Sequence, residues 1–127
     1  MMQRRTFFRW LLAGLGAAAA MPLVGAGYRS ILIQESPLAG FPFYAGALIW
    51  PSLSVGDELR LVREASNVHD SNAVAVYDHD EQLGYVPRVE NTTVARMLDR
   101  GARLEARISE LSDEDAWERI RFTISLA

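Results

Sequence analysis

The sequence contains no cysteine and no lysine. Without cysteine, the chain can form neither disulfides nor thiolate metal sites. A P-loop needs a lysine on the nucleotide phosphates, and Schiff-base chemistry needs a lysine amine. Both kinds of enzyme are therefore excluded for this chain, and all 13 of its Lys/Arg positions are arginine.

The sequence also lacks a recognisable catalytic arrangement. Ser66, His69 and Ser71 are close in sequence, but no G-x-S-x-G elbow positions a nucleophile. Neighbouring carboxylates occur chiefly in the acidic loop 113–115, which is typical of solvated surface. We therefore predict a protein that is not an enzyme and holds no cofactor.

The N-terminal segment 1–26 differs from the rest of the chain. Residues 1–10 hold three arginines and no acid, and residues 11–26 carry no charge. A basic start, an apolar stretch and a small-residue exit are typical of an export signal, and Arg4–Phe8 (RRTFF) resembles a twin-arginine signal. An uncleaved membrane anchor is the alternative, because the stretch from Trp10 to Tyr28 is nearly as long as the run of about 20 apolar residues that a membrane span needs. We expect a bacterial protein that is exported to the periplasm or anchored facing outward.

Residues 27–127 form the predicted folded domain, and they are acidic. They hold 10 arginines and 16 acids, a net charge of −6. Tight binding to a phosphate backbone normally requires a basic surface. A nucleic-acid ligand would therefore require that positive charge be gathered locally.

Hydrophobic patterning predicts short strands and one helix. The predicted strands are 41–53, 57–63, 73–77, 83–86, 103–111 and 117–126, with 73–77 and 83–86 forming a hairpin. An entry segment at 28–40, with a short extended stretch at 31–33, precedes them. The helix begins after Asn91 as N-cap and stops at Gly101. Consecutive strands with short turns favour a mainly β fold. We predict a small antiparallel OB-like or SH3-like barrel of five to six strands with one helix, preceded by the apolar signal helix.

Three motifs carry a family resemblance. They are Arg63-Glu64, then N-x-x-D-x-N-A-V-x-V from Asn67 to Val76, then LGYVP from Leu83 to Pro87. In this order and spacing, over about residues 41–126, the chain resembles the HIRAN domain. It departs from the family at Ala65 and Val68, where proline is frequent.

The resemblance implies a six-stranded OB-like barrel that grips the 3′ end of single-stranded DNA. Aromatic side chains would stack on the terminal bases, and the Asp of the N-x-x-D loop would meet the terminal hydroxyl. The residues at the matching positions are Phe43, Tyr44, Asn67, His69, Asp70 and Tyr85. Pro42 stands where a relative can carry a phosphate-binding arginine, and His69 stands where tyrosine is frequent. Zinc binding or acid-anhydride hydrolysis would belong to domains fused to larger relatives.

Other roles remain open for these residues. Asn67, Asp70 and Asn72 are residue types that shape turns by bonding nearby backbone amides. Adjacent residues of a strand face opposite ways, so only one of Phe43 and Tyr44 would be buried.

The ligand and its phosphate contacts also have alternatives. Arg63 and Arg88 are candidates for phosphate contacts, although either could pair with an acid. The alternative function is an exported protein- or glycan-interaction module that uses the same surface.

A metal site is not predicted. His69-Asp70 and Asp78-His79-Asp80 offer ligand types for divalent ions. An extended run between Asp70 and Asp78 would separate them by roughly 26 Å. Each end alone holds too few ligands for a structural zinc ion.

Overall fold

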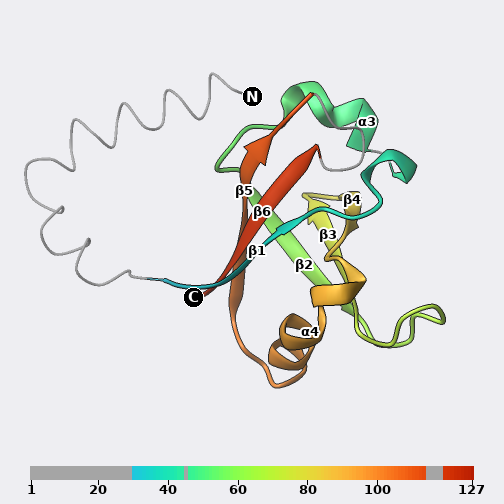
Figure 1. Ribbon diagram of the computed structural model, residues 1–127, viewed down its shortest axis with the longest axis vertical. Helices are drawn as coiled ribbons and strands as arrows, with labels where there is room; N and C mark the ends of the chain where they lie inside the picture. The colour runs from blue at the N-terminus through green and yellow to red at the C-terminus, as the bar shows by residue number, and fades with distance from the viewer. Residues whose placement is uncertain (1–29, 45, 114–118) are drawn as a thin grey trace, which may run out of the picture. The chain divides into compact units, whose positions relative to one another are not determined.

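The computed structural model describes residues 30–44, 46–113 and 119–127, and residues 31–127 form one compact unit (Figure 1). The predicted export signal lies outside the described residues, as do residues 114–118 of the acidic loop. Among the described helices, none has the length and apolar character needed to cross a membrane.

Six strands form a single antiparallel sheet (Figure 1). They are β1 (Ile31–Pro37), β2 (Glu58–Glu64), β3 (Ala73–Asp78), β4 (Glu81–Tyr85), β5 (Leu104–Leu111) and β6 (Ile120–Leu126). Their order in the sheet is β1-β6-β5-β2-β3-β4. The mainly β, antiparallel prediction is confirmed, and the predicted hairpin is β3 and β4, which pair with Asp78 opposite Glu81.

The predicted closed barrel is wrong, because the edge strands β1 and β4 do not pair with each other. One isolated bridge joins Ala39, two residues beyond the end of β1, to Tyr85 of β4, and in it each N–H donates to the other residue's carbonyl at 2.9 Å. Directly after Ala39 the chain turns away at Gly40, whose φ is 81°. The sheet therefore stays open beyond this bridge.

The predicted strand at 41–53 is also wrong. This segment forms three short helical turns, η1 (Phe41–Phe43), α3 (Gly46–Ile49) and η2 (Trp50–Ser52). A proline lies in the first positions of both η1 and η2, where its fixed φ and missing N–H favour a helical turn. Phe41 is only 1% exposed and lies in the core. Phe41, Ile49 and Trp50 therefore pack against the core from helical turns and not from a strand, whereas Phe43 and Leu48 remain exposed.

The helix prediction is confirmed by α4 (Thr92–Asp99), which follows the short turn η3 (Arg88–Glu90). Gly101 adopts a φ of 83°, the left-handed conformation that ends many helices. The N–H of Ala102 donates to the Met97 carbonyl at 2.9 Å, and that of Gly101 to Leu98 at 3.0 Å. These two bonds form the Schellman termination.

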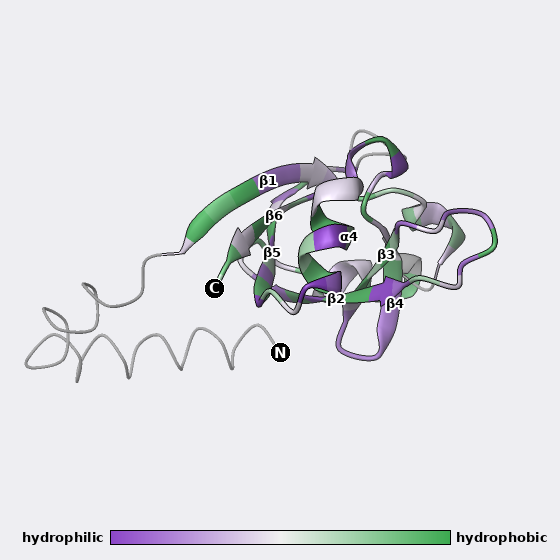
Figure 2. Ribbon diagram, turned by 90° about the horizontal axis from the view of Figure 1, so that it is seen from below, coloured by the Kyte–Doolittle hydropathy of each residue, from purple (hydrophilic) through white to green (hydrophobic). Residues whose placement is uncertain are grey.

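The core lies between the sheet and α4 with its neighbouring turns. On β6, Ile120, Phe122 and Ile124 are buried in alternation, as expected for a strand with one face inward. Residues 73–76 of β3 are all buried, because α4 packs beside this strand. The tip joining β3 to β4 is hydrophilic (Figure 2). The sheet thus supplies a rigid frame from which the loop between β2 and β3 projects.

Candidate functional site

The loop between β2 and β3 is ordered by its own polar side chains. The Asn67 side-chain oxygen Oδ1 accepts from the backbone N–H of His69 at 2.8 Å and of Asp70 at 3.2 Å. Asp70 Oδ1 in turn accepts from the Asn72 N–H at 2.9 Å. These are Asx-type bonds that fix a turn locally. The turn-shaping role predicted for the side chains of Asn67 and Asp70 is confirmed. Asn72 takes part in the turn through its backbone N–H and not through its side chain.

A second bond attaches this loop to helix α4. Asn91 is 1% exposed and stands at the N-cap position, as predicted, but its side chain makes no capping bond. Its Nδ2 donates instead to Asp70 Oδ2 at 2.8 Å. The conformation of the Asp70 side chain is therefore set from both the loop and the helix.

The carboxylate of Asp70 is stabilised in its charged form. The bond from the Asn72 N–H contributes most to lowering the pKa of Asp70, followed by the Asn91 bond and the nearby positive charges of Arg88 and Arg63. Partial desolvation opposes these effects without cancelling them. A carboxylate has about four acceptor positions, so the two bonds to protein leave room for a donor from a ligand.

Glu64, at the end of β2, joins the loop to Tyr85 on β4. Its Oε1 accepts from Asn67 Nδ2 at 3.0 Å and from the Tyr85 hydroxyl at 2.8 Å. Burial, together with the Glu64 carboxylate, raises the pKa of Tyr85 to about 12. The phenol therefore stays protonated as a donor to Glu64 at neutral pH, and Asn67 and Tyr85 belong to one hydrogen-bonded unit.

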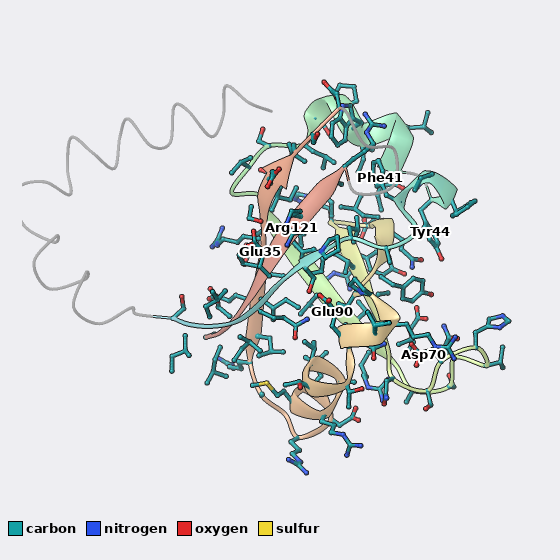
Figure 3. All side chains as sticks on the ribbon, viewed as in Figure 1. Glu35, Phe41, Tyr44, Asp70, Glu90 and Arg121 are labelled. Atoms are coloured by element: carbon teal, nitrogen blue, oxygen red, sulfur yellow. The ribbon has the colours of Figure 1, made fainter. Side chains whose placement is uncertain are left out.

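The aromatic residues of the candidate site divide by burial. Tyr44 is half-buried and packs edge-on against Tyr85, with ring centroids 5.9 Å apart. Phe43 is 73% exposed. Tyr44 and Asp70 lie on the same side of the domain in Figure 3. Only one of Phe43 and Tyr44 is turned inward, as predicted, although a helical turn and not a strand produces the difference.

The remaining predicted residues lie at the margin of this unit. His69 and Arg88 are exposed. Arg63 is engaged: its Nε donates to Asp99 Oδ1 at 2.9 Å and its Nη1 to the Ala73 carbonyl at 3.1 Å. A phosphate contact by Arg63 would require it to share or leave that ion pair.

Four predicted site residues are thus brought together through an acid that the sequence analysis did not select. Tyr44, Asn67, Asp70 and Tyr85 are connected directly or through Glu64. The motif match already contained Glu64, and this was the available signal. The contact of Asn91 with Asp70 joins positions 21 residues apart and had no sequence signal.

Candidate metal ligands do not gather in the described ranges. No group of three or more His, Asp or Glu side chains there is arranged to hold an ion. At the β3–β4 tip, the His79 Nδ1 and Asp78 Oδ1 atoms lie 3.3 Å apart. This pair alone offers too few ligands for a structural site.

Comparison with solved structures identifies similar folds. The crystal structure of a protein from Lactobacillus plantarum matches with a TM-score of 0.65 and 24% identity, covering 76% of this chain and 97% of that chain. The crystal structure of the HIRAN domain of human HLTF matches with a TM-score of 0.61 and 19% identity, covering 76% of this chain and 78% of that chain. At these identities the likeness establishes a shared fold.

Among curated proteins, no relative matches the chain. The family model described as the HIRAN domain matches residues 31–127. That range contains the whole sheet, helix α4 and the hydrogen-bonded unit around Glu64. The chain therefore belongs to the HIRAN domain family.

Proposed function

We propose that the domain is a non-enzymatic module that binds the 3′ end of a single nucleic-acid strand. The observation that carries the proposal is the doubly anchored carboxylate of Asp70. It lies in a loop that Asn67 and Glu64 join by hydrogen bonds to Tyr85, whose ring packs against Tyr44. Membership of the HIRAN family supports the ligand class.

Selection of a free end would come from Asp70. A terminal 3′ hydroxyl can donate a hydrogen bond to a carboxylate, and such charge-assisted bonds are the stronger ones. A terminal phosphate offers no such donor at neutral pH and adds negative charge beside the carboxylate. Asp70 would therefore favour a free hydroxyl over a phosphorylated end.

Affinity would come from stacking and from local positive charge. Phe43 presents an exposed ring, and stacking on an aromatic side chain contributes about 1–3 kcal/mol per base. The half-buried Tyr44 would shape the edge of the site beside it. Arg88 is exposed and its charge contributes to lowering the pKa of Asp70, which supports a role for it in meeting a phosphate near the strand end.

The proposal is tested by fluorescence anisotropy with a strand of about 12 nucleotides, within the usual range of single-strand sites. The strand carries either a 3′ hydroxyl or a 3′ phosphate and is titrated at low salt. We expect wild-type protein to prefer the hydroxyl end by roughly tenfold or more, the size of one charge-assisted hydrogen bond. Asp70→Ala should remove the preference while circular dichroism shows an intact fold.

Asp80→Ala is the matched control, because it removes one exposed carboxylate at the hydrophilic β3–β4 tip. It should keep the preference for the hydroxyl end. Equal binding of both strands by wild-type protein would remove the end-binding role. Absence of binding to either strand would remove nucleic acid as the ligand, and a glycan or peptide would then be titrated in its place.

A further inference from the structure

The nine arginines of the described residues fall into two groups. Five have their guanidinium groups in contact with other parts of the protein. These are Arg60 with the His79 carbonyl and the Tyr77 ring, Arg63 with Asp99, Arg107 with the Gly56 carbonyl, Arg119 with the Trp50 ring, and Arg121 with Glu35. These five serve the fold.

The other four are Arg88, Arg96, Arg100 and Arg103. All are exposed, and within the described part of the chain their guanidinium groups make no hydrogen bond or ion pair. They are consecutive arginines within 16 positions of the sequence. The described arginines whose guanidinium groups make no hydrogen bond or ion pair therefore occur together, on η3, α4 and the turn that follows.

This segment differs in charge from the rest of the domain. From Arg88 to Arg103 the chain holds four arginines and two acids, a net charge of +2. The other described residues hold five arginines and eleven acids, a net charge of −6. One of the two acids in the segment, Asp99, is already paired with Arg63. The positive charge that an acidic domain needs for a polyanion is gathered here.

Helix α4 and its C-cap residue carry two of the four arginines. Arg96 and Arg100 are four residues apart, so they lie on one face about 6 Å apart along the axis. Val94 and Ala95 are fully buried against the core and fix the helix with that face outward. Arg96 and Arg100 are therefore held by the helix and its C-cap, with Arg88 before them on η3 and Arg103 after them in the following turn.

The series of four arginines begins at the candidate site. Asn91 precedes α4 and donates to Asp70, and the charge of Arg88 on η3 acts on the same carboxylate. A strand whose end lies at Asp70 would thus leave the site beside the first of the four arginines. We propose that Arg88, Arg96, Arg100 and Arg103 form a track for the phosphates of a single strand that continues away from the bound end. This inference rests on the proposed function and adds the path of the strand.

The experiment measures how affinity depends on salt for strands of two lengths with free 3′ ends. A strand of about 12 nucleotides would reach the track, and a strand of about 3 would occupy the end site alone. For single strands, each phosphate contact contributes about 0.7 to the slope of log affinity against log salt. Arg96→Ala/Arg100→Ala should lower the slope for the long strand by about 1.4 and leave the short strand unchanged.

Arg107→Ala/Arg121→Ala is the matched control, since it removes the same charge from β5 and β6. It should leave the long-strand slope close to that of wild-type protein. An equal loss in both double variants would overturn the track, because net charge alone would then explain the effect. An unchanged long-strand slope in Arg96→Ala/Arg100→Ala would also overturn the track. If that variant still prefers a free end, the proposed function would stand.

Two further outcomes separate the remaining possibilities. Wild-type protein that binds neither strand would overturn the track and the proposed function together. In the second outcome, wild-type protein binds vesicles rich in phosphatidylserine and Arg96→Ala/Arg100→Ala does not, while both proteins bind the long strand equally. This result would assign the four arginines to a membrane surface and overturn the track.

Discussion

The loop from Ala65 to Asn72 and the segment from Phe41 to Ser52 flank the candidate site and are held in different ways. The loop is fixed by hydrogen bonds, two to Asn67 Oδ1 and two to the Asp70 carboxylate. The Phe41–Ser52 segment is fixed by apolar packing, with Phe41 buried and its ring 5.9 Å from that of Trp50. The polar loop sets the direction of individual atoms, whereas the aromatic segment sets the position of a surface.

The loop and the aromatic segment would therefore contribute differently to the site. Hydrogen bonds are directional, so the loop can present the Asp70 oxygens in one orientation. Packing is less directional but rigid, so the aromatic segment can hold the rings on which the proposed stacking depends. Substitutions of buried residues in the segment should therefore lower the free energy of unfolding, and substitutions in the loop should lower the selectivity for a ligand.

The largest effect is expected from Phe41→Ala in the aromatic segment. Phe41 is 1% exposed, and removing a buried phenyl ring typically costs 3–5 kcal/mol. Urea unfolding should show this loss. Phe43→Ala, in the same turn but 73% exposed, should change the free energy of unfolding by less than about 0.5 kcal/mol and weaken strand binding instead. Equal destabilisation by both variants would break the distinction between packing and presentation.

Gly84→Ala tests the bridge between Ala39 and Tyr85 beside the candidate site. A Cβ at this position would lie 2.2 Å from the Ala39 carbonyl oxygen, so the bridge between Ala39 and Tyr85 must open. We expect a loss of about 1–3 kcal/mol in urea unfolding. Gly56→Ala is the control, because its Cβ would meet nothing within 4 Å and only its positive φ is strained. A smaller loss at Gly84 than at Gly56 would contradict the structure around Tyr85.

Asn91→Ala tests the bond that holds the loop against α4. Loss of a hydrogen bond to a charged group costs about 1.5–3 kcal/mol. The pKa of Asp70 should also rise toward its ordinary value, because one of the bonds that lower it is removed. A carbon-13 NMR titration of the Asp70 carboxyl measures that change. Asn72→Ala should leave the Asp70 pKa nearly unchanged, since its contribution comes from the backbone N–H.

The smallest effect is the pH dependence that Asp70 confers. Its pKa is lowered by folding, so its contribution to stability is present above the unfolded-state value of about 3.9 and is lost as the pH falls through the lower native value. The stability advantage of wild-type protein over Asp70→Asn should therefore shrink in urea unfolding below about pH 4. An advantage that grows with acid would contradict the assigned environment. Asp80→Asn controls for the loss of one exposed charge.

The parts that could be predicted from the sequence are those with local causes. Strands β2, β3 and β6 follow from alternating or continuous apolar residues, and the end of α4 follows from Gly101. The Asx turn follows from Asn67 and Asp70, whose side chains reach their own backbone. Each of these features depends on residues within a few positions of one another.

The features that were missed depend on distant contacts. The apolar residues at 41–53 are compatible with a strand, and Pro42 and Pro51 direct them into helical turns that only the core makes favourable. The local sequence identifies Asn91 as an N-cap residue, but its bond to Asp70 depends on a fold that brings the two residues together. The sheet stays open because the chain turns away at Gly40, directly after the bridge between Ala39 and Tyr85, a tertiary outcome that a count of strands does not determine.

The central claim is that the loop and the aromatic segment form one site for the end of a strand. Its most direct test is an NMR titration of the protein with a short single strand that has a free 3′ hydroxyl. The backbone amides of residues 67–72 and the ring signals of Phe43, Tyr44 and Tyr85 should shift together and saturate with a single dissociation constant. Shifts confined to one of the two regions, or two different constants, would contradict the claim.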